Sequence, residues 1–163
     1  MGEIMQVVPE LEHFDHDDAW RLGNALVQRC RADKLPATVA IWLGEQRVFH
    51  SAQVGSSADN DRWVERKARI VRHFGRASAE VHATYAADDV EGFLRMFALP
   101  IDLYFPAGGA VPLVVRGAMV GVLAISGLPG TEDHDLAVEA LNEFGRSAPK
   151  MTVPHDSQHQ AAP

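Results

Sequence analysis

The chain has 163 residues, with 15 lysines and arginines against 22 aspartates and glutamates, and a formal net charge of −7. Its length and its 47 % hydrophobic residues suit one globular domain with its own core. The negative charge argues against nucleic-acid partners, and no apolar run approaches the roughly 20 residues that span a membrane.

The N-terminal residues 1–13 form a mixed, acidic lead-in to a domain predicted over residues 14–146. This lead-in lacks the basic and apolar regions that are typical of a secretion signal. The single cysteine, Cys30, cannot form an internal disulfide, which is compatible with a reducing compartment. These features together predict a cytoplasmic protein.

A first helix is predicted from Asp15 to Lys34. Trp20, Gly23, Val27 and Cys30 recur at helical spacing, so they are expected to share one face. Cys30 is interpreted as a small buried apolar residue on that face.

A hairpin and a second helix follow the first helix. The apolar runs Thr38–Leu43 and Arg47–His50 flank a short polar connection that contains glycine, which is typical of a hairpin. A helix is then expected over Asn60–Phe74, with Ser57 or Asp59 as its N-cap.

The rest of the chain is expected to complete one antiparallel sheet, flanked by helices. Pro, Gln, His and Ser dominate from Ser147 onward, so residues 147–163 are predicted to be a disordered tail. The fold class is therefore α+β, with five strands in the sheet. The further elements predicted are helices over residues 77–83, 88–97 and 131–144 and strands over residues Ile101–Phe105, 111–115 and 119–125.

Glycines and a proline punctuate the C-terminal half in a distinctive pattern. It comprises Gly108-Gly109-x-x-Pro112, Arg116-Gly117, Gly121, Ser126-Gly127 and Asp133-His134, with Asn60-x-x-Trp63-x-x-x-Lys67 upstream. Over residues 14–144 the pattern resembles the GlcG/HbpS-like family, often labelled "haem-degrading", in the branch whose members are mostly of unknown function. The resemblance implies a profilin-like fold with a five-stranded antiparallel sheet, assembly into homo-oligomers, and haem as a candidate ligand.

Lys67 is the sharpest candidate for a ligand-binding residue. It shares a helix face with the large apolar residues Trp63, Ile70 and Phe74. A lysine in that position extends its amine to solvent, pairs with a carboxylate such as Asp133, or holds the anionic group of a ligand. Trp63, one turn before it, is either a core residue or a stacking surface.

Two further groups of residues could carry chemistry. Gly108 and Gly109 could present backbone N–H groups to an anion, or could simply form a tight turn. Ser126, Asp133 and His134 lie near the start of the last helix, where they could bind an anion or transfer protons. The alternative is that Asp133 complements the helix dipole while His134 faces solvent.

Histidines are considered both as haem ligands and as metal ligands. His50, His73, His82 and His134 are candidate axial ligands for haem, and the sequence does not rank them. His13-x-x-His16 has chelating spacing but no third ligand in register, so no bound metal is predicted.

The sequence leaves three functional hypotheses open. The first is a homo-oligomeric binding module for a small anionic ligand, with haem as one candidate and a site of Asn60, Trp63, Lys67, Gly108, Gly109, Ser126, Asp133 and His134. The second is a small-molecule enzyme in which Asp133 and His134 act as acid–base groups. The third is an assembly or chaperone-type interaction protein whose arginine-rich helix, around residues 61–76, docks on an acidic face of another subunit.

Overall fold

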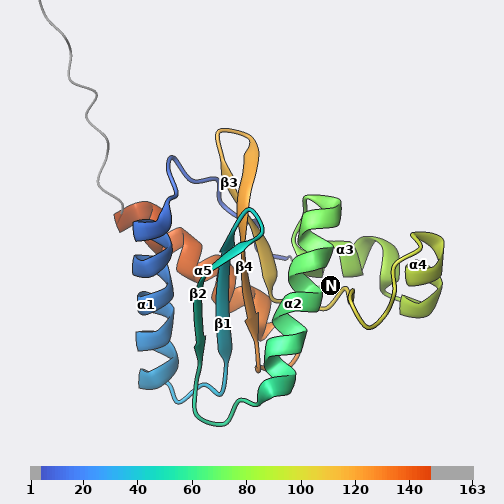
Figure 1. Cartoon of the computed structure of the whole chain (residues 1–163), viewed down its shortest axis with the longest axis horizontal. Coiled ribbons are helices and arrows are strands. Elements are labelled where there is room, and N and C mark those ends of the chain that lie inside the picture. The colour runs from blue at the N-terminus through green and yellow to red at the C-terminus, as the bar shows by residue number, and fades with distance from the viewer. Residues whose placement is uncertain (1–4, 148–163) are drawn as a thin grey trace, which may run out of the picture.

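The computed structural model describes residues 5–147, which form an antiparallel sheet covered by helices on both faces (Figure 1). The sheet of the described residues has four strands in the order β2-β1-β4-β3. The strands are β1 (Thr38–Leu43), β2 (Gln46–Ala52), β3 (Ala110–Val115) and β4 (Ala118–Ser126). The helices are α1 (His16–Ala32), α2 (Ala58–Phe74), α3 (Ser78–Val81), the π-helix η1 (His82–Ala86), α4 (Val90–Met96) and α5 (Glu132–Ser147).

The α+β fold class and nearly all of the predicted helices and strands are confirmed. Ser57 is the N-cap residue of α2, as one of the two sequence alternatives had it. A disordered tail was predicted from residue 147, but Ser147 is still helical, as the last residue of α5. The rest of the predicted tail, from residue 148 onward, lies outside the described residues. No helix within residues 5–147 is both long and apolar enough to cross a membrane.

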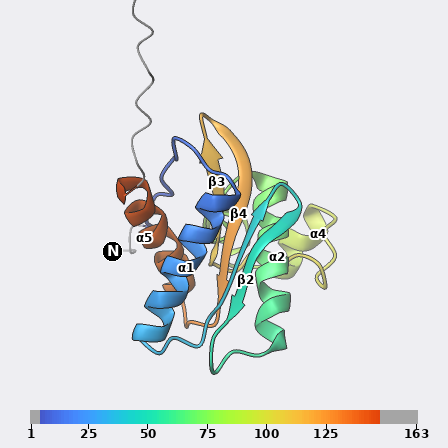
Figure 2. The ribbon, with the colours of Figure 1, turned by 60° about the vertical axis from the view of Figure 1, so that its left-hand side comes forward.

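Two helical layers sandwich the sheet. Helices α1 and α5 pack on one face, where the larger core cluster contains Leu22, Leu26 and Leu141 (Figure 2). Helix α2 covers the other face, where Val64 and Val71 meet the apolar side chains of the strands. Central strand β1 is therefore buried on both sides, which explains its continuous apolar run in place of an alternating pattern.

A smaller third cluster lies on the side of α2 that faces away from the sheet. It is built from α3, η1 and α4, and its buried members include Ile70, Val81 and Phe93. Figure 1 shows these short helices projecting beyond the edge of the sandwich.

The expectation of a fifth strand over Ile101–Phe105 is wrong, and with it the five-stranded sheet. The backbone turns there because Leu103 and Tyr104 both donate their N–H groups to the Pro100 carbonyl. Side chains of α2 bind the carbonyls of this segment, since Arg66 donates to Ile101 O at 2.8 Å. These bonds satisfy the backbone groups that a strand would offer to a neighbour.

The predicted buried face of α1 is only partly right. Gly23, Val27 and Cys30 are buried as expected, but Trp20 is 64 % exposed. The buried face also includes Leu22 and Leu26. Gly23 is needed because the ring of Phe49, from β2, occupies the space where a side chain would lie.

Gly23 of α1 and Gly145 of α5 are expected to respond to alanine with opposite signs. At Gly23 an added Cβ would lie 2.5 Å from the Phe49 ring, so the overpacked variant should lose about 1–3 kcal/mol of unfolding free energy. At Gly145 the nearest atom is 3.8 Å away, so alanine should add about 0.5–1 kcal/mol. Urea denaturation of both variants checks the pair, and stabilisation by both substitutions would contradict the close packing of α1 on β2.

Candidate functional site

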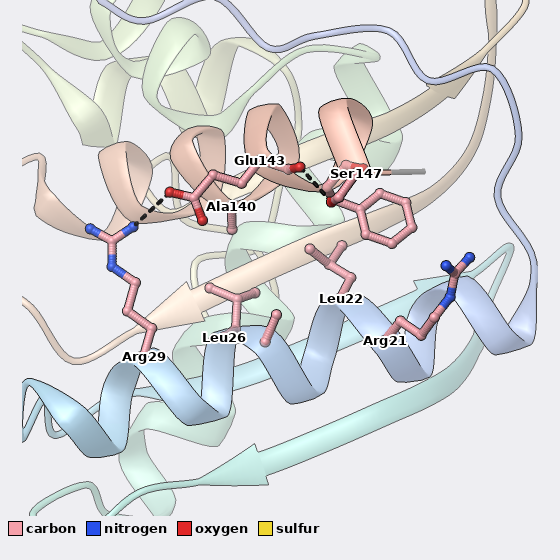
Figure 3. A pocket seen from close by; sticks show the side chains of 9 residues that line it. Arg21, Leu22, Leu26, Arg29, Ala140, Glu143 and Ser147 are labelled. Carbon is pink, nitrogen blue, oxygen red and sulfur yellow. Dashed lines mark hydrogen bonds and ion pairs between the residues drawn. The ribbon is translucent and has the colours of Figure 1, made fainter. Parts of the chain in front are cut away.

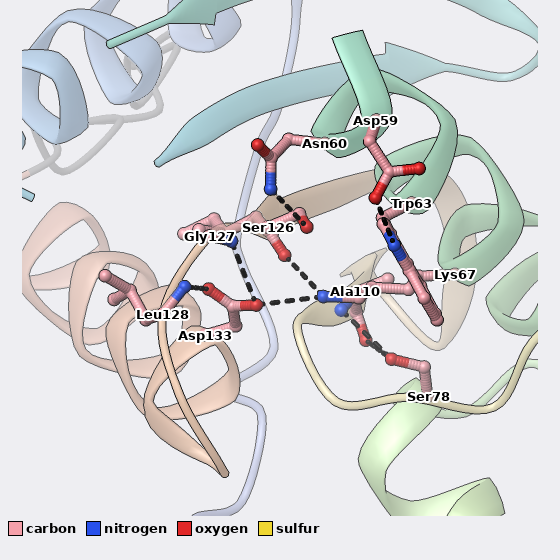
Figure 4. Close-up of polar contacts among 11 residues, drawn as sticks. Asp59, Asn60, Trp63, Lys67, Ser78, Ala110, Ser126, Gly127, Leu128 and Asp133 are labelled. Atoms are coloured by element: carbon pink, nitrogen blue, oxygen red, sulfur yellow. Dashed lines mark hydrogen bonds and ion pairs between the residues drawn. The ribbon is translucent and has the colours of Figure 1, made fainter. Parts of the chain in front are cut away.

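Lys67 and Asp133 form a buried ion pair that joins the two helical layers at one end of the sheet (Figure 4). Lys67 comes from α2 and Asp133 from α5, and their side chains are only 5 % and 6 % exposed. The Lys67 Nζ lies 2.9 Å from Asp133 Oδ2 and donates a second hydrogen bond, of 3.0 Å, to the carbonyl of Ile125 on β4. The ion pair that the sequence left as one alternative for Lys67 is therefore present.

The carboxylate of Asp133 is occupied on both of its oxygens. Oδ1 accepts a hydrogen bond of 2.9 Å from the Leu128 N–H, and Oδ2 accepts a longer one of 3.4 Å from the Gly127 N–H. Asp133 thereby holds the loop that connects β4 to α5, as well as the Lys67 amine. Both carboxylate oxygens of Asp133 are therefore already used as hydrogen-bond acceptors.

Gly109 makes room for the ion pair. It has a φ of +125°, and an added Cβ would lie 2.9 Å from Lys67 Nζ and 2.8 Å from the Asp133 Cβ. Its carbonyl accepts from the Ile125 N–H. Gly108 lies beside the Cβ of His134, 3.6 Å from where its own Cβ would be. Gly109 therefore has a packing role here, in addition to the turn that the sequence suggested, whereas a Cβ at Gly108 would make only ordinary contacts.

Asn60 and Ser126 lie next to this ion pair, while Trp63 makes other contacts. Asn60 Nδ2 donates to Ser126 Oγ at 3.3 Å, which links α2 to the end of β4. Trp63 donates from its indole N–H to Asp59 at 3.0 Å, and its ring packs edge-on against Phe105 at 5.1 Å. Trp63 therefore braces the 100–105 segment.

His134 does not face solvent, which corrects one sequence alternative. It is 1 % exposed, and its Nε2 lies 3.2 Å from the carbonyl oxygen of Gln6, in the N-terminal segment that covers it. Its Nδ1 is buried and has no hydrogen-bond partner among residues 5–147. Substrate access to His134 would require this segment to move, so its acid–base role stays a prediction.

Burial governs the electrostatics of the Lys67–Asp133 pair. Desolvation lowers the pKa of Lys67 below its ordinary value, while the charge and the hydrogen bond of Asp133 oppose that shift. Taking two charges out of water costs several kcal/mol per ion, which the pair recovers only through good geometry and further hydrogen bonds. The contacts to Ile125, Leu128 and Gly127 are those further bonds.

Two cavities lie away from this ion pair, and the sequence gave no sign of either. One is a groove between α1 and α5 with a volume of about 280 Å³ (Figure 3). Leu22, Leu26 and Phe144 make it apolar, and Arg21 and Arg29 flank it. The other cavity, of about 240 Å³, lies between α2 and the β1–β2 hairpin and has a polar lining.

An aromatic surface formed by α2, η1 and α4 is a third region of interest. Phe74 is stacked on Tyr85, with ring centroids 6.1 Å apart, and meets Phe97 edge-on at 5.1 Å. These rings are only partly covered, since Tyr85 is 46 % exposed and the adjacent Met96 of α4 is 79 % exposed. The sequence predicts a helix over residues 88–97 that ends at Phe97, but not the partners that the fold brings to this ring.

The candidate haem ligands are now distinguishable. His134 is buried, and the Nε2 of His50 lies 2.6 Å from Asp61 Oδ1. The Nδ1 of His82 is buried without a partner among the described residues. Of these four histidines, His73 is the one that is both exposed and part of the aromatic surface. Its ring centroid lies 4.8 Å from that of Phe74.

The candidate metal ligand His16 is not part of the group of ligand atoms that gathers near the start of α1. His13 instead lies with Asp15 and Asp18, the ligand atoms of all three being within 4.8 Å of one another. Asp18 is already used as an acceptor by His13, by the Asp15 N–H and by Arg21. This group is explained by the capping of α1 and carries no metal assignment.

Comparison with known families and sequences gives consistent matches. The family model described as "Haem degrading protein HbpS-like" matches residues 14–142. A UPF0303 protein of Streptomyces avermitilis is 43 % identical over 147 residues, which covers 84 % of this chain and 90 % of the relative. A UPF0303 protein of Streptomyces coelicolor is 42 % identical over 132 residues, covering 80 % of this chain and 83 % of the relative.

Solved structures support the fold. The crystal structure of the Ybr137w protein is similar with a TM-score of 0.78 and 28 % identity, over 85 % of this chain and 83 % of that one. The PduOC:Heme complex matches with a TM-score of 0.67 at 20 % identity, over 79 % and 93 % of the two chains. HbpS matches with a TM-score of 0.64 at 20 % identity, over 88 % and 94 %. At 20 % identity the last two show the fold alone.

Removing one member of the buried ion pair should destabilise the protein strongly. Asp133→Asn keeps an oxygen for the Leu128 N–H but leaves Lys67 without its counter-charge, so the unfolding free energy should fall by about 3–5 kcal/mol at neutral pH. Glu91→Gln breaks an exposed pair with Arg95, 3.8 Å apart, and should change it by less than about 1 kcal/mol. Urea denaturation of both variants measures the contrast.

The loss in Asp133→Asn should shrink as the pH rises. The pKa of Lys67 is lowered in the folded state, so the folded protein holds fewer protons and stability increases with pH up to the unfolded pKa. Without Asp133 the pKa of Lys67 should be lower still, so the increase in stability with pH should begin at a lower pH in the variant. The difference from wild type should therefore be smaller at pH 10 than at pH 7, and a difference that does not depend on pH would contradict the charged pair.

Proposed function

The chain belongs to the HbpS-like family of haem degrading proteins, and from this premise we propose that it is a binding module for a small anionic ligand, with haem as the leading candidate. Binding is favoured over turnover because the two candidate acid–base residues are not available to a substrate. Both carboxylate oxygens of Asp133 already accept hydrogen bonds, and His134 is buried. The relatives named UPF0303 carry no activity in their names.

The aromatic surface beside His73 is where we place the ligand. Haem is a planar apolar ring that needs a flat, uncharged contact surface and an axial nitrogen, sulfur or oxygen. Phe74, Tyr85 and Phe97 provide partly exposed rings, and His73 provides an exposed imidazole at their edge. The juxtaposition of exposed His73 with these rings is the observation that carries the proposal.

The surroundings of His73 also suit the two carboxylates of haem. Arg76 follows three residues later along the chain, and its pair with Glu80 is loose, at 3.7 Å with both side chains about half exposed. An exposed arginine of this kind can exchange its partner at little cost.

Relatives of the same fold support haem as the candidate. One of the solved neighbours is a complex with haem, and the matching family model carries a haem-related description. The residues first expected to bind the ligand surround Lys67, whose amine is buried in its ion pair with Asp133. A ligand role for them would require Lys67 to leave Asp133. We therefore assign Lys67 a bracing role in this proposal.

Homo-oligomeric assembly and a cytoplasmic location remain part of the proposal. The arginine-rich face of α2 was expected to dock on another subunit. Arg66 and Arg69 instead donate to carbonyls of the 100–105 segment, whereas Arg62 on α2 and Arg76 just after it are exposed. An assembly interface would thus use the 100–105 segment together with α2.

Haem titration tests the proposal directly. The protein should give a saturable Soret shift, and His73→Ala should weaken the apparent affinity by on the order of tenfold or more, since it removes the axial ligand. His16→Ala is the matched control, because His16 is exposed on α1 outside the aromatic surface. A wild-type spectrum identical to that of free haem, or equal loss in both variants, would overturn the proposal.

A further inference from the structure

The N-terminal residues 5–9 have irregular backbone and lie over His134 of α5. They are exposed or only partly buried, and Val7 is 84 % exposed. The chain is anchored at Leu11, which is 4 % exposed and donates its N–H to the Val114 carbonyl of β3 at 2.8 Å. Residues 5–9 therefore form a strap that leads away from this anchor.

The strap is attached lightly to the domain. Its polar contact with α5 joins the Gln6 carbonyl oxygen to the Nε2 of His134, 3.2 Å apart. Val8 packs against the main core but is only partly buried, and Pro9 has no N–H to donate. Segments with so few buried apolar contacts open locally, at a free energy far below that of global unfolding.

The hydrogen bonds of His134 also favour opening. A carbonyl oxygen can only accept, so Nε2 carries the proton of the bond with Gln6. Nδ1 is then left without a hydrogen-bond partner among the described residues, although the side chain is only 1 % exposed. A buried polar atom without a partner destabilises the closed arrangement, whereas an uncovered imidazole can turn both nitrogens to water. The closed arrangement therefore gains one hydrogen bond at Nε2 and lacks one at Nδ1.

We propose that the strap opens while the rest of the domain stays folded, and that opening gives small solutes access to His134. The Gln6 carbonyl occupies the place that an acceptor oxygen of a ligand would take at Nε2. Access of this kind is the step that an acid–base role of His134 requires. Because His134 belongs to α5 and the aromatic surface to α2, η1 and α4, strap opening does not require haem to bind.

Labelling of histidines with diethyl pyrocarbonate, read by mass spectrometry of peptides, tests whether the strap opens on its own. His134 should be labelled more slowly than exposed His16, because His134 reacts only in the open state. The rate at His134, relative to His16, should stay constant as urea is raised toward the unfolding transition, since local opening exposes little new surface. A rate that rises with the full urea dependence of global unfolding, or no labelling below the transition, would show that His134 is reached only by unfolding and would overturn the proposal.

Val8→Ala and Val7→Ala form a matched pair of strap variants. Val8→Ala removes a partly buried contact between the strap and the core, so labelling of His134 should become roughly threefold to tenfold faster. Val7→Ala removes an exposed side chain and should leave the rate unchanged. Equal labelling rates in the two variants would contradict a strap that is held by Val8.

Gly23→Ala separates local opening from global unfolding. Gly23 contacts Phe49 of β2, at the edge of the sheet opposite to β3, where the strap is anchored. This variant should be less stable in urea denaturation, yet its His134 should be labelled as slowly as in the wild type. If labelling required global unfolding, the same loss of stability would raise the rate by at least about fivefold. Should Gly23→Ala be as stable as the wild type, the urea dependence of the wild-type rate decides alone.

Discussion

The buried ion pair between Lys67 and Asp133 is the constraint on which the arrangement of the layers depends. Its two charges come from helices on opposite faces of the sheet, and each is satisfied only when both helices are docked. A buried charge that loses its partner is expensive, so partly docked arrangements of α2 or α5 are strongly disfavoured. Gly109 belongs to the same constraint because only a residue without a Cβ leaves room for the amine.

This constraint changes how the shared glycine, lysine and aspartate pattern is interpreted. Residues that recur in a family are often taken as ligand-binding residues, but here Lys67, Asp133 and Gly109 hold the end of the sheet together. An exposed imidazole lies elsewhere, at His73 beside the aromatic rings. The proposed ligand site is therefore on the flank of α2 that meets η1 and α4.

Local patterns in the sequence were sufficient for much of the fold. The glycine at the β3–β4 turn, the apolar run of β1 and the spacing within α2 each report on neighbours that are close along the chain. The same spacing made the Lys67 pair with Asp133 a named alternative, because a lysine on an apolar face requires a partner. The aromatic surface was not foreseen, since its rings come from helices that are separate in sequence.

The sequence by itself determined the fold class, the positions of nearly all helices and strands, the burial of Cys30 and, as one alternative, the pairing of Lys67 with Asp133. The tertiary structure alone decided that Ile101–Phe105 turns, that Trp20 is exposed and that His134 is covered. For Trp20 and His134 the deciding contact comes from a distant part of the chain, and the local turn at Ile101–Phe105 is held in place by such a contact as well. Arg66 of α2 binds the carbonyl of Ile101, the ring of Phe49 occupies the space beside Gly23, and the N-terminal segment at Gln6 covers His134.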